Sequence, residues 1–257
     1  MQYSRAALTV FVTVAMALTA CSAPGQTRFE YYRVTIDGEQ ILGISANDTL
    51  TRAVVVFFHG IGGSEFSIAD SQHLAMTTEL LDAGFAVVAS RASGDAFGNP
   101  VSQHNYMYLG GAAAQHYGTE DIFFLADSMG ALAAANLLAT KLTQRVRGFA
   151  AINPMLNLAE ATPQFQSMVA ESYGPQPVDA SNPMGQPIGA FRDKRMKFYV
   201  NRDDPNAPPG TNAYAFKERF GPESDISIAE CSGSVGDHSC YQGADLVKWF
   251  SEMEKRS

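Results

Sequence analysis

The sequence has little positive charge, few cysteines and no long hydrophobic run after its first twenty residues. It carries 18 Lys and Arg against 26 Asp and Glu, a formal net charge of -8, and no run of basic residues offsets this balance. A nucleic-acid-binding surface is therefore not expected. Beyond the N-terminal segment, no stretch is long and apolar enough to span a bilayer. Neither an internal repeat nor a low-complexity tract is present, so the 257 residues, 46% of them hydrophobic, indicate one large globular domain.

The first twenty residues have the pattern of a secretory signal peptide. Arg5 makes the start basic, residues 6–17 form an apolar core, and Leu18-Thr19-Ala20-Cys21 follows. These four residues resemble the lipobox of bacterial lipoproteins, in which the cysteine is lipidated and becomes the mature N-terminus. A plain signal peptide cleaved nearby and an uncleaved anchor are the alternatives. The predicted organisation is a signal peptide at residues 1–20, a lipid anchor on Cys21, a tether at residues 21–27 and a domain at residues 28–257, exported to the bacterial cell envelope and anchored to its membrane.

Only three cysteines are present. An exported domain meets an oxidising environment, in which thiols pair. If Cys21 carries lipid, Cys231 and Cys240 remain as an even pair. A bridge between them would close a loop of about ten residues and stabilise the fold by roughly 2–3 kcal/mol. We predict this disulfide, with two free thiols as the alternative.

Apolar runs and helical patterns alternate through most of the chain. Two strands around Asp37-Gly38 predict an N-terminal hairpin. The alternation that follows predicts a doubly wound, mostly parallel sheet with helices on both faces, an α/β fold. Its ligands are expected beyond the carboxyl ends of the strands. The expected elements are hairpin strands at residues 28–36 and 40–45, buried strands at 53–58, 85–90, 146–152 and directly before Ser128, and helices at 69–83, 102–117 and from Ser128 to about residue 141.

Residues 153–191 interrupt this alternation. They contain several Pro and Met residues and one helical stretch near residues 158–171. We interpret them as a small cap inserted between strands. A long structureless excursion is the alternative, although such loops are uncommon in compact domains. Regular alternation resumes with a strand at 197–200, a helix at 211–220, a strand at 226–229 and a closing helix at 241–255.

A serine lies at the turn between a predicted strand and a predicted helix. An apolar run, Ser128 and an Ala- and Leu-rich helix follow one another, which is the layout of a nucleophile elbow with Ala126 in place of the first Gly of G-x-S-x-G. A sharp turn lifts the hydroxyl out of the backbone, and the helix N-terminus presents N–H groups to an anion. An ordinary turn with Ser128 as a helix cap is the alternative. The neighbouring Asp127 is expected to face solvent.

A serine nucleophile needs a histidine base and an acid that orients the base. His238 follows the last predicted strand in a Gly-flanked loop, where a sheet of this kind can deliver it to Ser128. Asp203 and Asp204 follow the strand at residues 197–200, and either residue fits the role of the acid. The order Ser, Asp, His along the chain is that of an α/β-hydrolase. The other histidines are His59 in a Gly-rich loop and His73, His104 and His116 in predicted helices.

The Gly-rich loop His59-Gly60-Ile61-Gly62-Gly63 follows a predicted strand. Ester chemistry needs two fixed N–H groups where negative charge develops on the carbonyl oxygen. Met129 supplies one such group and Ile61 the other, with Gly62 as the alternative to Ile61. A Gly-rich loop can also hold phosphate, but no Gly-Lys-Ser/Thr follows and G-x-G-x-x-G spacing is absent, so a nucleotide is not expected. No metal or cofactor is implied.

With these motifs the chain resembles the α/β-hydrolase superfamily over about residues 28–255. In relatives the acid often lies in a Gly-x-x-Asp-x-x-Val-Pro context, and the alignment of residues 201–208 to it favours Asp204 over Asp203. The loop at residues 94–100 is similar to a pocket-lining loop of exported bacterial hydrolases, so Asn99 is expected only to line a pocket. The residues that carry the resemblance are His59-Gly60-Ile61-Gly62-Gly63, Ser128-Met129-Gly130, Asp204-Pro205 and Gly236-Asp237-His238.

This resemblance implies a serine hydrolase that cleaves carboxylic esters of small molecules through an acyl-enzyme. Ser128 would attack, His238 would transfer the proton and Asp204 would orient His238. A peptidase or thioesterase with the same triad, and a non-catalytic, membrane-tethered binding domain on a hydrolase scaffold, are the alternatives. The cap favours acyl or aromatic esters because it contains apolar residues, among them Met155, Leu156, Phe165, Met168 and Met184.

Overall fold

The computed structural model describes residues 28–36, 38–47, 49–140, 143, 145–233 and 237–255. The predictions of a signal peptide, of lipidation at Cys21 and of a tether lie outside these residues, as do Asp37 of the hairpin turn and Gly236 of the histidine motif. Within the described ranges, no helix has the length and hydropathy needed to cross a membrane.

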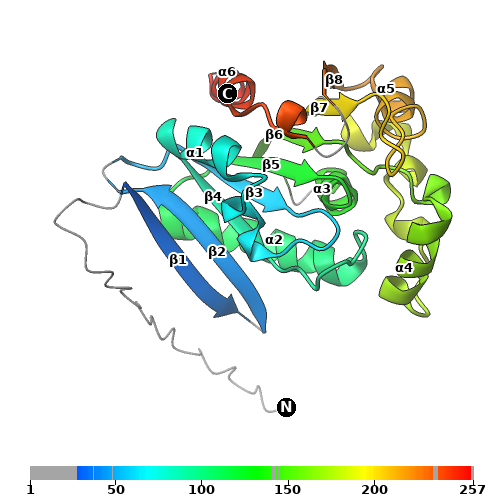
Figure 1. The fold of residues 1–257 in the computed structure, drawn as a ribbon, viewed down its shortest axis with the longest axis horizontal. Helices are drawn as coiled ribbons and strands as arrows, with labels where there is room; N and C mark the ends of the chain where they lie inside the picture. Colours follow the sequence, from blue (N-terminus) through cyan, green and yellow to red (C-terminus); the bar gives the residue numbers. More distant parts are fainter. Residues whose placement is uncertain are drawn as a thin grey trace, which may run out of the picture.

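An eight-stranded sheet forms the centre of the molecule, in the order β1-β2-β4-β3-β5-β6-β7-β8 (Figure 1). The first two strands form the predicted antiparallel hairpin, which pairs antiparallel with β4, and all remaining neighbours are parallel. This confirms the predicted mostly parallel α/β sheet. The strands are β1 (Phe29–Ile36), β2 (Glu39–Ala46), β3 (Ala53–Phe58), β4 (Phe85–Ser90), β5 (Ile122–Asp127), β6 (Val146–Ile152), β7 (Arg195–Asn201) and β8 (Asp225–Cys231).

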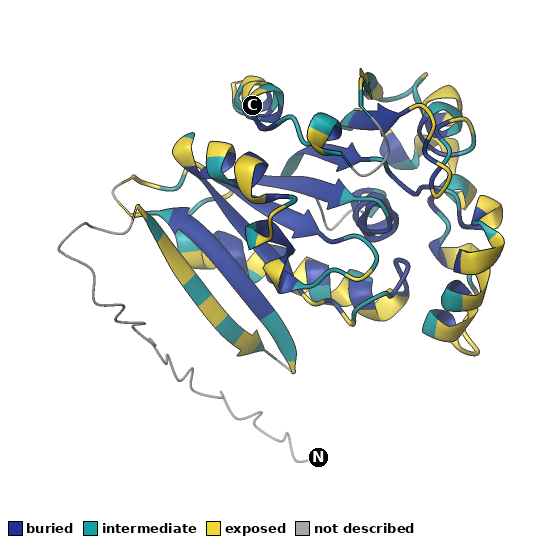
Figure 2. Cartoon of the chain, viewed as in Figure 1, coloured by how far each residue is buried: buried dark blue, intermediate teal, exposed yellow. Residues whose placement is uncertain are grey.

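Helices cover both faces of this sheet. α1 (Leu74–Asp82) and α6 (Gly243–Glu254) pack on one face. α2 (Pro100–Tyr117), α3 (Gly130–Leu138) and α5 (Ala213–Phe220) pack on the other. The central strands are therefore buried throughout, while β1 alternates between exposed and half-buried positions (Figure 2).

The side-chain alternation of β3 shows how one strand serves two cores. Val54 and Val56 belong to the apolar cluster beneath α2 and α3, whereas Val55 and Phe57 belong to the cluster beneath α1 and α6. Successive strand residues point to opposite faces. A strand covered on both sides consequently needs apolar residues at every position, which explains the uninterrupted apolar run in the sequence.

Several of the predicted helices differ in extent from the observed ones. The predicted helix at residues 69–83 is divided into a 3-10 helix, η1 (Glu65–Ala69), and α1. The predicted helix at residues 102–117 begins two residues earlier, because the Asn99 side chain accepts a hydrogen bond from the Ser102 N–H at 2.9 Å and thereby caps α2.

The segment predicted as a cap contains α4 (Pro163–Tyr173), which lies at the far end of the molecule from β1 and β2 (Figure 1). Phe165 and Val169 of this helix join an apolar cluster that includes Phe97 and, from the elbow, Met129. The segment therefore packs onto the predicted nucleophile region. The short 3-10 helices within it are η3 (Leu158–Glu160), η4 (Asp179–Ser181), η5 (Pro183–Gly185) and η6 (Ile188–Phe191).

Hydrogen bonds also connect α4 to the loop before α2. The Tyr173 hydroxyl donates to the Phe97 carbonyl oxygen at 2.9 Å, and the Asn99 amide donates to the Ser172 carbonyl oxygen at the same distance. Asn99 thus caps one helix and holds another, so the expectation that it only lines a pocket was wrong. Its side chain is buried and its amide is committed to structure.

Candidate active site

Ser128 lies at a sharp turn between β5 and α3. Its φ of 45° is in the left-handed region, which strains a residue with a side chain. Its backbone N–H donates to the Ile152 carbonyl oxygen at 2.9 Å, and its own carbonyl oxygen accepts from the Met155 N–H at 3.0 Å. These bonds fix the turn against the carboxyl end of β6. The Ser128 hydroxyl makes no hydrogen bond to any residue that the structure describes.

The turn also requires a glycine two residues further on. A Cβ added to Gly130 would lie 2.2 Å from the Phe58 carbonyl oxygen and 2.8 Å from that of His59. No side chain fits at this distance, because α3 starts directly against the end of β3. Small residues after the nucleophile therefore bring the elbow and the Gly-rich loop together.

The candidate N–H donors of the Gly-rich loop differ in whether they already have a partner. The Gly62 N–H donates to Asp95 Oδ1 at 2.7 Å, so this donor is already in use. The N–H groups of Ile61 and Met129, by contrast, donate to no residue within the described ranges. This geometry favours Ile61 over Gly62 as the partner of Met129 in an oxyanion hole.

His59 holds this loop in place. One ring nitrogen lies 2.8 Å from the Gly60 carbonyl oxygen and the other 2.8 Å from that of Arg91. The ring is 1% exposed and so links the loop after β3 to the loop after β4. Because both of its nitrogens contact backbone oxygens, His59 is placed for a structural role.

Asp204 and His238 are not hydrogen-bonded to each other or to Ser128 among the described residues. The Asp204 carboxylate is 7% exposed and accepts from the N–H groups of Asn206 and Ala207 at 2.8 and 3.2 Å. His238, an exposed residue in the 3-10 helix η7 (His238–Cys240), instead contacts the Gln72 carbonyl oxygen through Nδ1 at 3.2 Å. Catalytic hydrogen bonds often form only in a substrate complex, and the triad stays a prediction.

Asp203 and Asp204 differ in their surroundings. Asp203 is exposed, whereas Asp204 is buried. A buried carboxylate that already accepts two backbone N–H groups is held in one orientation. The structure gives Asp204 the better-defined position of the two.

The predicted disulfide is present. Cys231 at the end of β8 and Cys240 in η7 are bonded, with their Cα atoms 5.2 Å apart. The bridge connects the sheet to the short helix on which His238 lies. It therefore restricts where this imidazole can move.

The expectation that Asp127 faces solvent was wrong. Its side chain is 14% exposed, accepts from the Tyr241 hydroxyl at 3.4 Å and lies 3.3 Å from His73 Nε2. The other ring nitrogen of His73 lies 2.7 Å from Asp70 Oδ1. No sequence pattern indicates this cluster, because its members come from three segments that only the fold brings together.

The carboxylates of this cluster raise the pKa of the His73 imidazole. Burial lowers the pKa of its imidazole, but the hydrogen bonds and negative charges of Asp127 and Asp70 outweigh burial and raise the pKa above its ordinary value. The ring also makes edge contacts with Phe57 and Tyr241. His73 is thus a buried histidine whose two ring nitrogens both contact carboxylates.

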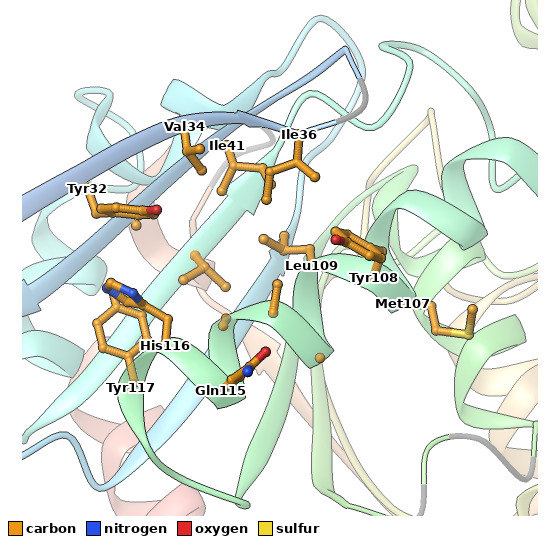
Figure 3. Close-up of a pocket in the computed structure, with 15 residues that line it drawn as sticks. Tyr32, Val34, Ile36, Ile41, Met107, Tyr108, Leu109, Gln115, His116 and Tyr117 are labelled. Carbon is orange, nitrogen blue, oxygen red and sulfur yellow. The ribbon is translucent and has the colours of Figure 1, made fainter. Parts of the chain in front are cut away.

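Among the described residues, no group of three or more His, Cys, Asp and Glu side chains is placed to hold a metal ion. A cavity of about 660 Å³ lies between the hairpin and α2, lined among others by Tyr32, Ile41, Leu109 and Tyr117 (Figure 3). Ser128 does not line this cavity, so it is separate from the candidate active site.

Comparison with solved structures identifies the fold. A brefeldin A esterase, a bacterial homologue of human hormone-sensitive lipase, matches with a TM-score of 0.65 and 15% identity over 93% of this chain and 81% of its own. EstE7, a homologue of hormone-sensitive lipase from a metagenome library, matches with a TM-score of 0.66 and 17% identity over 90% of this chain and 88% of its own. Carboxyl esterase 2 of the fungus Tuber melanosporum matches with a TM-score of 0.64 and 14% identity over 92% of this chain and 89% of its own. The chain has the α/β-hydrolase fold.

Comparisons of sequence add no closer relative. No family model matches the chain, and no curated protein matches it. At identities below a fifth, the structural likeness establishes the fold, and the chemistry has to be argued from the site itself.

Proposed function

We propose that this protein is a serine hydrolase that cleaves carboxylic esters, with Ser128 as its nucleophile. The observation that carries the proposal is the strained turn at Ser128, with φ of 45°, beside the unused N–H groups of Ile61 and Met129. Strain of this kind persists where the surroundings enforce it, and it is common at catalytic residues. The esterases that share the fold support the same reaction class.

The proposed reaction has two steps. Ser128 Oγ attacks the ester carbonyl carbon while His238 takes its proton, and the N–H groups of Ile61 and Met129 stabilise the oxyanion. The C–O bond then breaks, and His238 returns the proton to the leaving alcohol. Water, activated by His238, hydrolyses the acyl-enzyme. Asp204 is the sequence-based candidate for orienting His238.

Apolar side chains around the elbow support an apolar acyl or aromatic substrate. Met129, Met155 and Phe165 are buried in one cluster, and Ile61 and Met168 pack against it while remaining partly accessible. The accessible parts of Ile61 and Met168 favour contact with hydrocarbon rather than with charged groups. We therefore propose small esters with apolar acyl groups as substrates.

The test compares the full chain, purified in a mild detergent, with its Ser128→Ala variant. We expect the wild-type protein to hydrolyse p-nitrophenyl esters and the variant to fall to the background rate, because the attacking oxygen is lost. Ser224→Ala is the matched control, since it removes one hydroxyl at the start of β8, on the opposite edge of the sheet. Equal rates in the wild-type protein and in Ser128→Ala would refute the proposal.

Two more measurements separate the alternatives. A fluorophosphonate probe should label Ser128, whereas a non-catalytic binding domain would not react. A panel of p-nitrophenyl esters of increasing chain length, thioesters and peptides then ranks the reaction classes. Faster turnover of thioesters or peptides than of every ester would replace esterase activity with one of the other two reactions.

A further inference from the structure

The His238 imidazole has a hydrogen-bond partner that the sequence did not suggest. Nδ1 lies 3.2 Å from the Gln72 carbonyl oxygen, which can only accept a hydrogen bond. In the neutral ring the proton must therefore be on Nδ1, which leaves the lone pair on Nε2. Within the described ranges Nε2 makes no hydrogen bond. This is the tautomer that a general base requires when it takes a proton through Nε2.

The Gln72 carbonyl oxygen is itself firmly positioned. The backbone N–H groups of Gln72 and His73 both donate to Asp70 Oδ1 at 2.9 Å, which fixes the turn before α1. The Gln72 side-chain amide donates to the Tyr241 hydroxyl. Tyr241 lies three residues after His238. Its contact with the Gln72 side chain therefore holds the His238 segment beside the Gln72 carbonyl oxygen.

Asp127 connects this arrangement to the nucleophile. The Tyr241 hydroxyl and His73 Nε2 lie 3.4 and 3.3 Å from Asp127 Oδ2, and Asp127 directly precedes Ser128 in the chain. Hydrogen bonds therefore link Asp127 of the elbow to Tyr241, Tyr241 to the Gln72 side chain and the Gln72 carbonyl to His238. His73, held at its other nitrogen by Asp70, braces the same carboxylate.

We propose that the Gln72 carbonyl oxygen orients His238, and that Asp127, His73 and Tyr241 are positioning residues that hold this carbonyl relative to Ser128. The proposal rests on the proposed function for its catalytic meaning. It assigns to a neutral backbone oxygen the orienting task that the sequence assigns to Asp204, whose carboxylate is engaged with its own loop. The turn before α1 then sets both the orientation and the tautomer of the His238 imidazole.

The first test observes the tautomer directly and needs no activity. Two-bond ¹⁵N–¹H correlation spectra of the ¹⁵N-labelled full chain, at a pH where His238 is neutral, report which ring nitrogen carries the proton, with His238→Gln giving the assignment. We expect the Nδ1-protonated signature in the wild-type protein and in Asp204→Asn. In Tyr241→Phe, which removes only the hydroxyl, we expect a mixture of tautomers.

The second test measures catalysis. Tyr241→Phe should lower kcat for a p-nitrophenyl ester by about 10–100-fold, because a misplaced base loses rate, and should change KM by less than about twofold, because the substrate contacts remain. Tyr199→Phe is the matched control, since its hydroxyl also donates to a carboxylate, that of Asp245, which is not one of the groups in this path. Gln72→Met, which keeps the carbonyl but removes the amide donor, should act in the same direction as Tyr241→Phe.

Several results would overturn the inference. An Nε2-protonated His238 in the wild-type protein would do so, and so would a tautomer change in Asp204→Asn that Tyr241→Phe does not cause. Equal kcat in Tyr241→Phe, Gln72→Met and Tyr199→Phe would also exclude a positioning role. If the wild-type protein shows no Ser128-dependent hydrolysis, the proposed function fails, while the spectra still decide which group orients His238.

Discussion

At the scale of single residues, Gly130 shows how closely backbone segments approach at the elbow. A Cβ at this position would lie 2.2 Å from the Phe58 carbonyl oxygen. We predict that Gly130→Ala destabilises the fold by about 1–3 kcal/mol, the usual cost of overpacking, measured as a lower urea midpoint. Gly111→Ala is the control, because that helical glycine faces open space and should gain about 0.5–1 kcal/mol. Equal midpoints in the two variants would contradict the close approach.

His73 makes a prediction about pH at the same scale. Its pKa is raised in the folded protein, since the charges and hydrogen bonds of Asp127 and Asp70 outweigh its burial. The folded state therefore holds the proton more tightly than the unfolded chain, whose histidine pKa is about 6.5. The resulting stability is fully present below that value and is lost as the pH rises through the folded-state pKa.

We accordingly expect the urea midpoint to fall with rising pH above about 6.5, and to fall less steeply in His73→Gln. His104→Gln serves as a control for the loss of one histidine elsewhere. The measurement is a series of urea denaturation curves between pH 6 and pH 9 for the three proteins. The same pH dependence of the urea midpoint in the wild-type protein and in His73→Gln would show that His73 does not cause the loss of stability with rising pH.

At the scale of elements, the disulfide connects β8 to η7, the short helix of His238. Reduction, or the double change Cys231→Ser and Cys240→Ser, should lower the stability by roughly 2–3 kcal/mol, since the loop between the cysteines is short. Ester hydrolysis should fall further than the loss of folded protein accounts for, because η7 becomes free to shift. The measurements are urea midpoints and kcat at a temperature where both proteins are folded. An unchanged kcat would show that the disulfide is not needed to position the His238 imidazole.

The elements of the sheet are largely predictable, and the reason is local. The apolar runs at β3 and β4, and the elbow sequence around Ser128, carry their strand and turn signals in their own residues. The contacts of the site are less predictable because they join distant segments. Nothing near Asp127 in the sequence indicates that His73 and Tyr241 will cover it, and nothing near His238 indicates that Gln72 will accept from it.

At the scale of the whole molecule, the candidate site lies at one edge of the sheet, where loops after β3, β4, β5 and β8 meet. The cap segment packs on this edge through α4, and hydrogen bonds from Tyr173 and Asn99 tie α4 to the loop before α2. The hairpin of β1 and β2 is at the opposite side of the fold (Figure 1).

The predicted lipid anchor has a consequence that can be measured. We propose that Cys21 is lipidated in a bacterial envelope, and we predict that the full chain expressed in a bacterium incorporates labelled palmitate and sediments with membranes. Cys21→Ser should lose the label and appear in the soluble exported fraction, because acylation supplies the anchoring energy. Cys231→Ser with Cys240→Ser is the control, since it removes thiols but not the anchor. Membrane association unchanged in Cys21→Ser, with the label lost, would indicate an uncleaved signal segment as the anchor, and label retained in that variant would refute lipidation at Cys21.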